Sequence, residues 1–284
     1  MQTVNALDPL RSALSALRAK GTIALVPTMG ALHDGHLTLV RKARARADAV
    51  VVSIFVNPLQ FGVNEDLDAY PRVLARDSEL LAAEGVDVLW APHVSAMYPE
   101  GFATSIRVSG VSEGLCGAAR PGHFDGVATV VCKLFNQVAP DMALFGEKDW
   151  QQLAVIRRMA RDLDLTSPHV ARIFGVPIVR EEDGLAMSSR NAYLTADERA
   201  RAVALPEAMR TAIARIEAGE KLAETLAALV QELMQAGFAS IDYAQLCDAE
   251  SLDVLAAPID RAMRLLVAAR LGTTRLIDNM AVGR

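Results

Sequence analysis

Short hydrophobic runs alternate with amphipathic segments along the first half of the chain. The hydrophobic runs are rich in β-branched and aliphatic residues and lie at 22–27, 49–56, 86–92 and 141–146. The segments between them carry apolar residues at helical spacing, at 36–47, 70–85 and 124–140. Runs that are apolar on both faces fit buried parallel strands, and parallel strands need crossover connections. The pattern therefore predicts an α/β fold in which helices cover both faces of a parallel sheet.

The pattern changes after about residue 190. Two segments there have helical periodicity, 195–219 and 221–237. The first opens with Thr195 and has Glu198 three residues later, which matches a capping box. Three further segments are expected to be strands of a small sheet, at 240–248, 261–272 and 274–282. We therefore predict an α/β domain over residues 1–190 and a smaller α+β domain over residues 191–284.

The composition is that of a folded globular protein. Of the 284 residues, 52% are hydrophobic and 22% are charged, which is enough apolar material for one large core or for a large and a small one. The net charge of −5 gives no sign of a surface for a polyanion, so nucleic acid is not expected as a partner.

Three features favour a soluble, cytoplasmic protein. Segment 1–21 lacks an uncharged core and a small-residue cleavage pattern, and it is expected to be a short amphipathic helix rather than a secretion signal. No apolar stretch approaches the roughly 20 residues of a membrane span, so no membrane partner is expected. The cysteines are odd in number and lack metal-ligand spacing, so we expect them to be reduced and mostly buried: Cys116, Cys132 and Cys247.

The first candidate chemistry follows the hydrophobic run at 22–27. The sequence PTMGALHDGH places His33 and His36 where a helix is expected to begin, near Asp34 or Gly35. Unpaired backbone N–H groups and the macrodipole at such a helix start bind anions, phosphate above all. The two histidines would donate hydrogen bonds to phosphate oxygens and stabilise charge on phosphorus. The alternative is that His33 only caps the helix and His36 packs in the core.

Two later segments carry groups suited to phosphate. In FGEKDWQQL, Lys148 begins another expected helix after a strand, where a cation suits a triphosphate, and Asp149 suits ribose hydroxyls. In DGLAMSSRN, the loop residues Ser188, Ser189 and Arg190 can donate several hydrogen bonds to phosphate oxygens. The alternatives are a solvated helix start for the first segment and an ordinary turn for the second.

Other polar side chains suit a small acid. Gln60 and Gln152 offer neutral amides, which recognise a hydroxy acid without holding its carboxylate in an ion pair. Their alternative is to be exposed polar residues. Arg120 and His123, in ARPGHF, form a further cluster that could hold a carboxylate.

Six blocks of the sequence resemble the pantoate–β-alanine ligase family, also called the pantothenate synthetases. They stand in the family's order and approximate spacing over nearly the whole chain: PTMGALHDGH, FVNPLQF, ARPGHFDGV, FGEKDWQQL, DGLAMSSRN and ARLGTTRLIDN. The H-x-G-H pattern at 33–36 alone marks only the wider nucleotidylyltransferase superfamily. Segment 162–174 is a few residues longer than the family pattern, and we expect it to lengthen a surface loop.

The resemblance implies a two-step ligation that uses ATP. The carboxylate of (R)-pantoate attacks the α-phosphorus of ATP to give pantoyl adenylate and pyrophosphate. The amine of β-alanine then attacks the acyl carbon to give pantothenate and AMP. The resemblance also implies a Rossmann-like N-terminal domain, a small C-terminal lid, a homodimer in the cytoplasm, and Mg²⁺ that arrives on the triphosphate.

The same resemblance assigns roles to residues of this chain. The expected catalytic residues are His36, the usual proton donor, with His33, Lys148 and Arg190. The expected ATP contacts are Met29, Gly30, Ala31, Leu32, His33, Asp34, Gly35, His36, Gly146, Glu147, Lys148, Asp149, Val179, Met187, Ser188, Ser189 and Arg190. Gln60 and Gln152 are expected to bind pantoate, with Gln60 also near β-alanine, and Asp77 is the candidate protein contact to Mg²⁺.

Two rival functions share the same expected site. One is a nucleotidylyltransferase that transfers AMP or CMP to a phosphorylated acceptor and has no amine-dependent second step. The other is a sensor that binds adenine nucleotide without turnover.

Overall fold

The computed structural model describes residues 1–62 and 65–283. By their contacts the residues form two units. The first comprises Met1–Ser109, Arg120–Glu147 and Val155–Pro177, and the second comprises Gly110–Ala119, Lys148–Ala154 and Ile178–Arg284. This grouping does not test the predicted boundary near residue 190, which stays a prediction.

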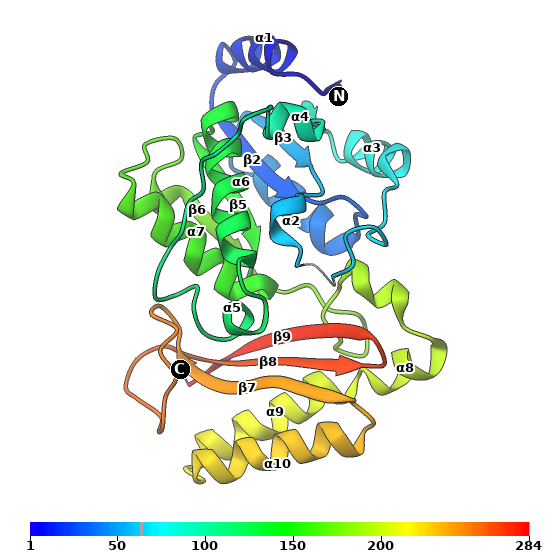
Figure 1. The fold of residues 1–284 in the computed structure, drawn as a ribbon, viewed down its shortest axis with the longest axis vertical. Helices are drawn as coiled ribbons and strands as arrows, with labels where there is room; N and C mark the ends of the chain where they lie inside the picture. Colours follow the sequence, from blue (N-terminus) through cyan, green and yellow to red (C-terminus); the bar gives the residue numbers. More distant parts are fainter. Residues whose placement is uncertain (63–64, 284) are drawn as a thin grey trace. The chain divides into compact units, whose positions relative to one another are not determined.

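The first unit contains a six-stranded parallel sheet (Figure 1). Its strands are β1 (Gln2–Val4), β2 (Ile23–Thr28), β3 (Ala49–Ile54), β4 (Val88–Trp90), β5 (Met142–Gly146) and β6 (Ile173–Val176). They pair in the order β1-β4-β3-β2-β5-β6, and every pair is parallel. The predicted parallel α/β sheet is therefore confirmed. Strands β1 and β6 were not predicted because their three and four residues are too short to show a pattern.

Helices of the first unit cover both faces of this sheet. They include α1 (Leu7–Arg18), α2 (Asp34–Arg44), α3 (Leu74–Ala83), α4 (Val94–Met97) and α6 (His123–Val138). Ala24 and Val26 of β2 pack in one core with Leu37 and Val40 of α2. Successive strand residues point to opposite faces. Because the intervening Leu25 is also fully buried and α6 contacts β2, the other face is covered as well.

The strand order reverses direction between β2 and β5. From β2 the chain proceeds through β3 to β4 on one side, whereas β5 and β6 extend the sheet on the other side. Ala24 and Leu25 of β2 pair with Met142 and Ala143 of β5, so the two strands end beside each other. Ligands of open parallel sheets bind at the carboxyl ends of strands at such a switch point.

Helix α7 (Trp150–Asp162) begins after the short 3-10 helix Glu147–Asp149 that follows β5. The expected surface loop beyond α7 is present over residues 163–169, which are mostly exposed, and the 3-10 helix Val170–Arg172 follows. Ile173 and Phe174 had been included in that loop, but they belong to β6, where they pair with β5.

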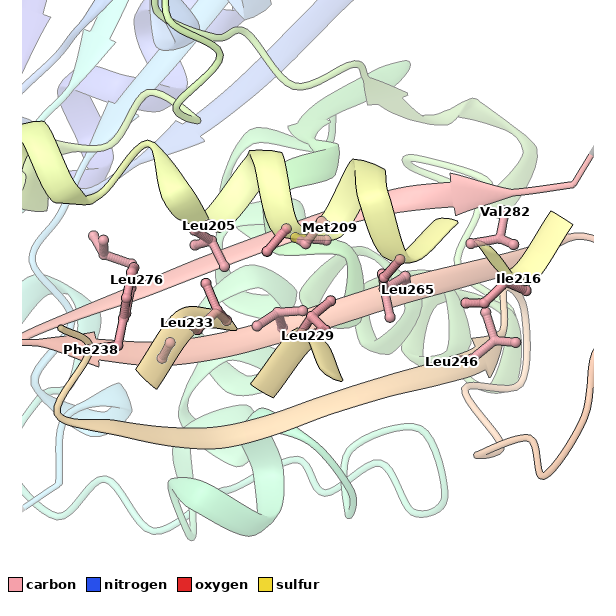
Figure 2. Packing of buried hydrophobic residues seen from close by; sticks show 14 of the residues in the cluster. Leu205, Met209, Ile216, Leu229, Leu233, Phe238, Leu246, Leu265, Leu276 and Val282 are labelled. Carbon is pink, nitrogen blue, oxygen red and sulfur yellow. The ribbon is translucent and has the colours of Figure 1, made fainter. Parts of the chain in front are cut away.

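The second unit contains an antiparallel sheet in the order β7-β8-β9, and it confirms the three strands expected there. These are β7 (Ser240–Asp248), β8 (Met263–Leu271) and β9 (Thr274–Val282). Helices α9 (Ala204–Glu217) and α10 (Leu222–Gln235) bury their apolar faces against the sheet around Leu265, as Figure 2 shows. The unit also includes the short helix α5 (Cys116–Ala119).

The single helix expected over 195–219 is two helices, α8 (Ala196–Arg201) and α9. The break follows from Pro206, which lacks an N–H and whose ring would clash with the carbonyl of Ala202 four residues earlier. Pro206 is tolerated because it lies in the first turn of α9. The predicted capping box is confirmed, since Glu198 N–H donates to Thr195 Oγ1 at 3.2 Å and Thr195 N–H donates to Glu198 Oε2 at 2.8 Å.

Two further expectations concern membranes and thiols. Within residues 1–62 and 65–283, no helix combines the length and the apolar character that crossing a membrane requires. Cys116, Cys132 and Cys247 are free thiols, as expected, and the first and last are buried.

Leu265 offers a test of the core of the second unit. Its side chain is 0% exposed between the sheet and its helices, so Leu265→Ala is expected to lower the free energy of unfolding by about 2–5 kcal/mol. Urea unfolding monitored by circular dichroism measures this change. Leu163→Ala, at a position 50% exposed, is the control and is expected to change it by less than about 0.5 kcal/mol. Equal effects of the two substitutions would contradict the described packing.

Candidate active site

The turn after β2 has an uncommon backbone conformation. Gly30 and Ala31 both have positive φ values, +82° and +51°. A β-carbon on Gly30 would also crowd Asp77 and Ile54, at 3.0 and 3.1 Å. Two consecutive left-handed residues cost free energy when one of them is not glycine, so the surrounding structure must hold this turn in place.

Asp77 of α3 holds the turn. Its carboxylate accepts the backbone N–H of Ala31 at 2.8 Å and that of Leu32 at 2.9 Å, one on each oxygen. Asp77 is 1% exposed, so these charge-assisted bonds lie away from solvent. The geometry supports a positioning role for Asp77, through the turn, more directly than a contact to Mg²⁺. Within the described part of the chain, no three His, Cys, Asp or Glu side chains come together as a metal site.

His33 and His36 lie at the start of α2, as the sequence predicted. His33 occupies the N-cap position, and the two ring centroids are 4.1 Å apart. His33 N–H donates to Nδ1 of His36 across a long 3.4 Å. A neutral His36 that accepts at Nδ1 carries its proton on Nε2, the nitrogen from which it can donate. Both residues are half-buried, so His36 is not a core residue as the alternative required.

Gln60 lies next to this turn, within the same unit. Its amide nitrogen is 2.9 Å from the sulfur of Met29, although the two residues are far apart in the sequence. Its amide oxygen accepts from Asn57 Nδ2 at 3.1 Å, which determines which end of the amide faces Met29. The structure therefore brings together the residue predicted to bind pantoate and the turn predicted to bind ATP.

Asn57 fixes the short 3-10 helix Pro58–Gln60, and the sequence gave it no role. It is 1% exposed, and its oxygen accepts from Leu59 N–H at 3.2 Å and from Tyr98 O–H at 2.7 Å. Its amide nitrogen also donates to the carbonyl of Gly126 on α6 at 3.1 Å. A β-carbon at Gly126 would overlap the carbonyl of Leu59, so α6 can approach this closely only with glycine. Its place beside Gln60 in FVNPLQF was the available sequence signal for Asn57.

The predicted Arg120–His123 cluster holds groups of the protein itself. Arg120 forms a two-point ion pair with Glu65, at 2.6 and 2.5 Å. Burial raises the pKa of Glu65, but hydrogen bonds and the charge of Arg120 outweigh it and lower that pKa to about 2. His123 Nδ1 lies 2.7 Å from the carbonyl oxygen of Gln60. The cluster thus does hold a carboxylate, that of Glu65, and it supports the backbone at Gln60.

The loop after β5 begins at the neighbouring strand end. Gly146 is half-buried, and a β-carbon there would have nothing within 4 Å. Glu147 and Lys148, the next residues, are half-buried, and Asp149 is exposed. Lys148 lies in the 3-10 helix Glu147–Asp149, before α7 rather than at its first turn.

The second unit carries the remaining predicted residues in a hairpin. Met187 N–H donates to the carbonyl of Val179 at 3.0 Å, so these two predicted ATP contacts are neighbours. Ser188 follows and caps the 3-10 helix Ser189–Tyr193, because its hydroxyl accepts the N–H of Arg190 at 3.2 Å. All of these residues are half-buried, which leaves part of each side chain accessible.

The two adjacent glutamines of α7 differ in their surroundings. Gln151 is 5% exposed, and its amide bonds to the carbonyls of Val111 and Gly114 and to the N–H of Cys116. Gln152 is half-buried. Since Gln151 is engaged by backbone groups, Gln152 is the better candidate for a ligand, as predicted.

A helix N-terminus at the switch point of a Rossmann-like parallel sheet is the geometry of the nucleotide-binding α/β proteins, and it defines the class of this protein. A family model described as Pantoate-beta-alanine ligase matches residues 2–281. Pantothenate synthetases of Novosphingobium aromaticivorans and Sphingopyxis alaskensis are 68% and 59% identical to it, over 100% of this chain and 99% and 100% of theirs.

Solved structures agree with this match. The crystal structure of pantothenate synthetase from Thermus thermophilus is similar, with a TM-score of 0.91, 47% identity and 99% of each chain covered. A pantoate-beta-alanine ligase from Francisella tularensis, complexed with beta-gamma ATP and beta-alanine, has a TM-score of 0.84 and 33% identity over 99% of this chain and 97% of its own. The chain therefore belongs to the pantoate-beta-alanine ligase family.

Asp77→Asn separates a role in holding the turn from a role in binding metal. The amide can accept only one of the two backbone N–H groups and turns its own N–H₂ toward the other, so a bond worth about 1.5–3 kcal/mol is lost. We expect faster amide hydrogen exchange at Ala31 and Leu32, and about tenfold weaker binding of an ATP analogue both with and without Mg²⁺. Glu79→Gln, at an exposed position of the same helix, is the matched control. Weaker binding only when Mg²⁺ is present would instead assign Asp77 to the metal.

Proposed function

We propose that the residues gathered at the end of β2 catalyse the reaction of this family, the ATP-dependent ligation of pantoate and β-alanine. The observation that carries the proposal is the 2.9 Å contact between the Gln60 amide and Met29, at the turn that leads into α2. It joins a group suited to a hydroxy acid to a turn suited to phosphate.

In the proposed first step, a carboxylate oxygen of pantoate attacks the α-phosphorus of ATP. The bond between that phosphorus and the bridging oxygen breaks, and pyrophosphate leaves with the electron pair. The N–H groups at the start of α2 and the Nε2 proton of His36 would stabilise the negative charge that develops. Lys148 and Arg190 are proposed to hold the departing phosphates, because their charge does not depend on a proton transfer at neutral pH.

In the proposed second step, the amine of β-alanine attacks the acyl carbon of pantoyl adenylate. A C–N bond forms, the bond from that carbon to the phosphate oxygen breaks, and AMP leaves while the amine loses a proton. Gln60 would orient the acyl group through its amide, whose direction Asn57 fixes. Adenylation is needed because a free carboxylate is a poor electrophile, whereas AMP is a good leaving group.

The remaining nucleotide contacts are proposed from both units. Those of the first unit are Met29, Gly30, Ala31, Leu32, His33, Asp34, Gly35, His36, Gly146 and Glu147. Those of the second unit are Lys148, Asp149, Val179, Met187, Ser188, Ser189 and Arg190, with Gln152 as the second pantoate contact. Mg²⁺ bound to phosphate oxygens and water would need no protein cage. A cytoplasmic homodimer is also proposed, and the free thiols fit a reducing compartment.

Product analysis separates the ligase from the nucleotidylyltransferase and the sensor. With ATP and pantoate alone, we expect pyrophosphate release limited to about one turnover, since the adenylate stays bound. Addition of β-alanine should then give continuous release of AMP together with pantothenate, measured by chromatography. Release of AMP that does not depend on β-alanine would contradict the ligase, and binding of ATP without any turnover would favour the sensor.

His36→Ala tests the proposed charge-stabilising group. We expect the adenylation rate to fall by about 10²- to 10⁴-fold, measured as pantoate-dependent exchange of labelled pyrophosphate into ATP, with folding retained. The matched control is His169→Ala, since His169 also caps a short helix, through a 3.2 Å bond to Ala171 N–H, at the opposite edge of the sheet before β6. Wild-type exchange in His36→Ala would remove His36 from the mechanism.

A further inference from the structure

The last of the six sequence blocks ends in Asp278 and Asn279, to which the sequence assigned no role. Both residues lie in β9, and each is 2% exposed. A buried carboxylate beside a buried amide costs free energy unless other groups satisfy both. Their partners belong to two separate segments that carry proposed ATP contacts.

Asp278 holds the base of the hairpin that leads to Ser188. Its two oxygens accept from the guanidinium of Arg180 at 2.7 and 2.9 Å, a two-point ion pair. Arg180 also donates to the carbonyl of Gly184 at 3.0 Å, and its backbone forms a bridge with Ala186. Asp278 therefore fixes both arms of the hairpin within two residues of Ser188.

Asn279 holds the segment that carries Lys148. Its amide nitrogen donates to the carbonyl of Lys148 at 2.8 Å. Its amide oxygen accepts from the guanidinium of Arg264, which lies over the ring of Trp150 at 3.5 Å. The indole N–H of Trp150 in turn donates to the carbonyl of Ala249 at 2.9 Å. The backbone on both sides of Asp149 is therefore attached to the small sheet.

The two side chains are also attached to each other. The backbone N–H of Asn279 donates to Oδ1 of Asp278 at 2.7 Å, the same oxygen that accepts from Arg180. The carboxylate thus receives donors from β9 itself and from the hairpin. All of these contacts lie within the second unit.

We infer that Asp278 and Asn279 are positioning residues for adenylation, which hold the Lys148 backbone and the Ser188–Arg190 loop in fixed places relative to one sheet. The inference rests on the proposed roles of Lys148 and Arg190 in binding ATP. Neither β9 side chain touches substrate in this account. They act through the position of the cation and of the loop donors, to which phosphoryl chemistry is sensitive.

Asn279→Asp removes one donor and changes little else. The carboxylate keeps the acceptor for Arg264 but presents an oxygen, instead of N–H₂, to the Lys148 carbonyl. We expect the KM for ATP to rise and the kcat of pyrophosphate exchange to fall, by about 5- to 20-fold in kcat/KM. The KM for β-alanine and the melting temperature should stay close to those of the wild-type enzyme.

Asp278→Asn is the second variant, since it keeps the size of the side chain and weakens the pair with Arg180. The control is Asp242→Asn on β7, whose carboxylate pairs with Arg275 of β9 at 2.7 Å, and which is expected to leave the ATP kinetics unchanged. Wild-type ATP kinetics in both folded β9 variants, or equal changes in the KM for ATP and β-alanine, would overturn the inference. Unfolding of both β9 variants would also overturn it, because it would assign the pair to stability alone.

Lys148→Ala distinguishes this inference from the site assignment on which it rests. If Asn279 acts through Lys148, then Asn279→Asp should add less than about twofold in the Lys148→Ala background, because coupled residues are not additive. An unchanged KM for ATP in Lys148→Ala alone would show that the assignment of Lys148 had failed. A large effect of Lys148→Ala with none of Asn279→Asp would reject only the inference about β9.

Discussion

The carboxylate of Asp77 holds the turn on which the proposed chemistry depends. Gly30 and Ala31 both adopt left-handed backbone conformations, and the Asp77 oxygens accept the N–H groups of Ala31 and Leu32. The turn lies between the end of β2 and the first residue of α2, so it sets where the N-terminus of that helix begins. His36, one turn into the helix, takes its position from the same constraint.

The sheet supplies the second constraint, through the order of its strands. Because β2 and β5 are parallel neighbours, the Met29–His36 turn and the loop at Gly146 start from adjacent strand ends. The contact between Gln60 and Met29 adds the 3-10 helix after β3 to this edge. Three segments that are distant in sequence thus meet where an open α/β sheet binds its ligand.

The sequence predicted much of this because buried parallel strands and helix starts have strong local patterns. The strand runs, the helix start at Asp34 and the Thr195 capping box follow from hydrophobic spacing and capping chemistry over a few residues. It missed what depends on long-range contacts. No local pattern shows that Asp77 caps a turn 46 positions earlier, that Gly126 must approach Leu59, or that Asn279 bonds to the Lys148 carbonyl. The break before Pro206 was a local signal that hydrophobic periodicity concealed.

The most direct test of the account is a crystal structure of the enzyme with a non-hydrolysable ATP analogue and pantoate. The account predicts the α-phosphate within hydrogen-bond distance of the N–H groups at the start of α2 and of His36 Nε2. It also predicts the pantoate hydroxyl or carboxylate on the amide of Gln60. Phosphates bound away from the Met29–His36 turn, or pantoate that does not contact Gln60, would contradict it.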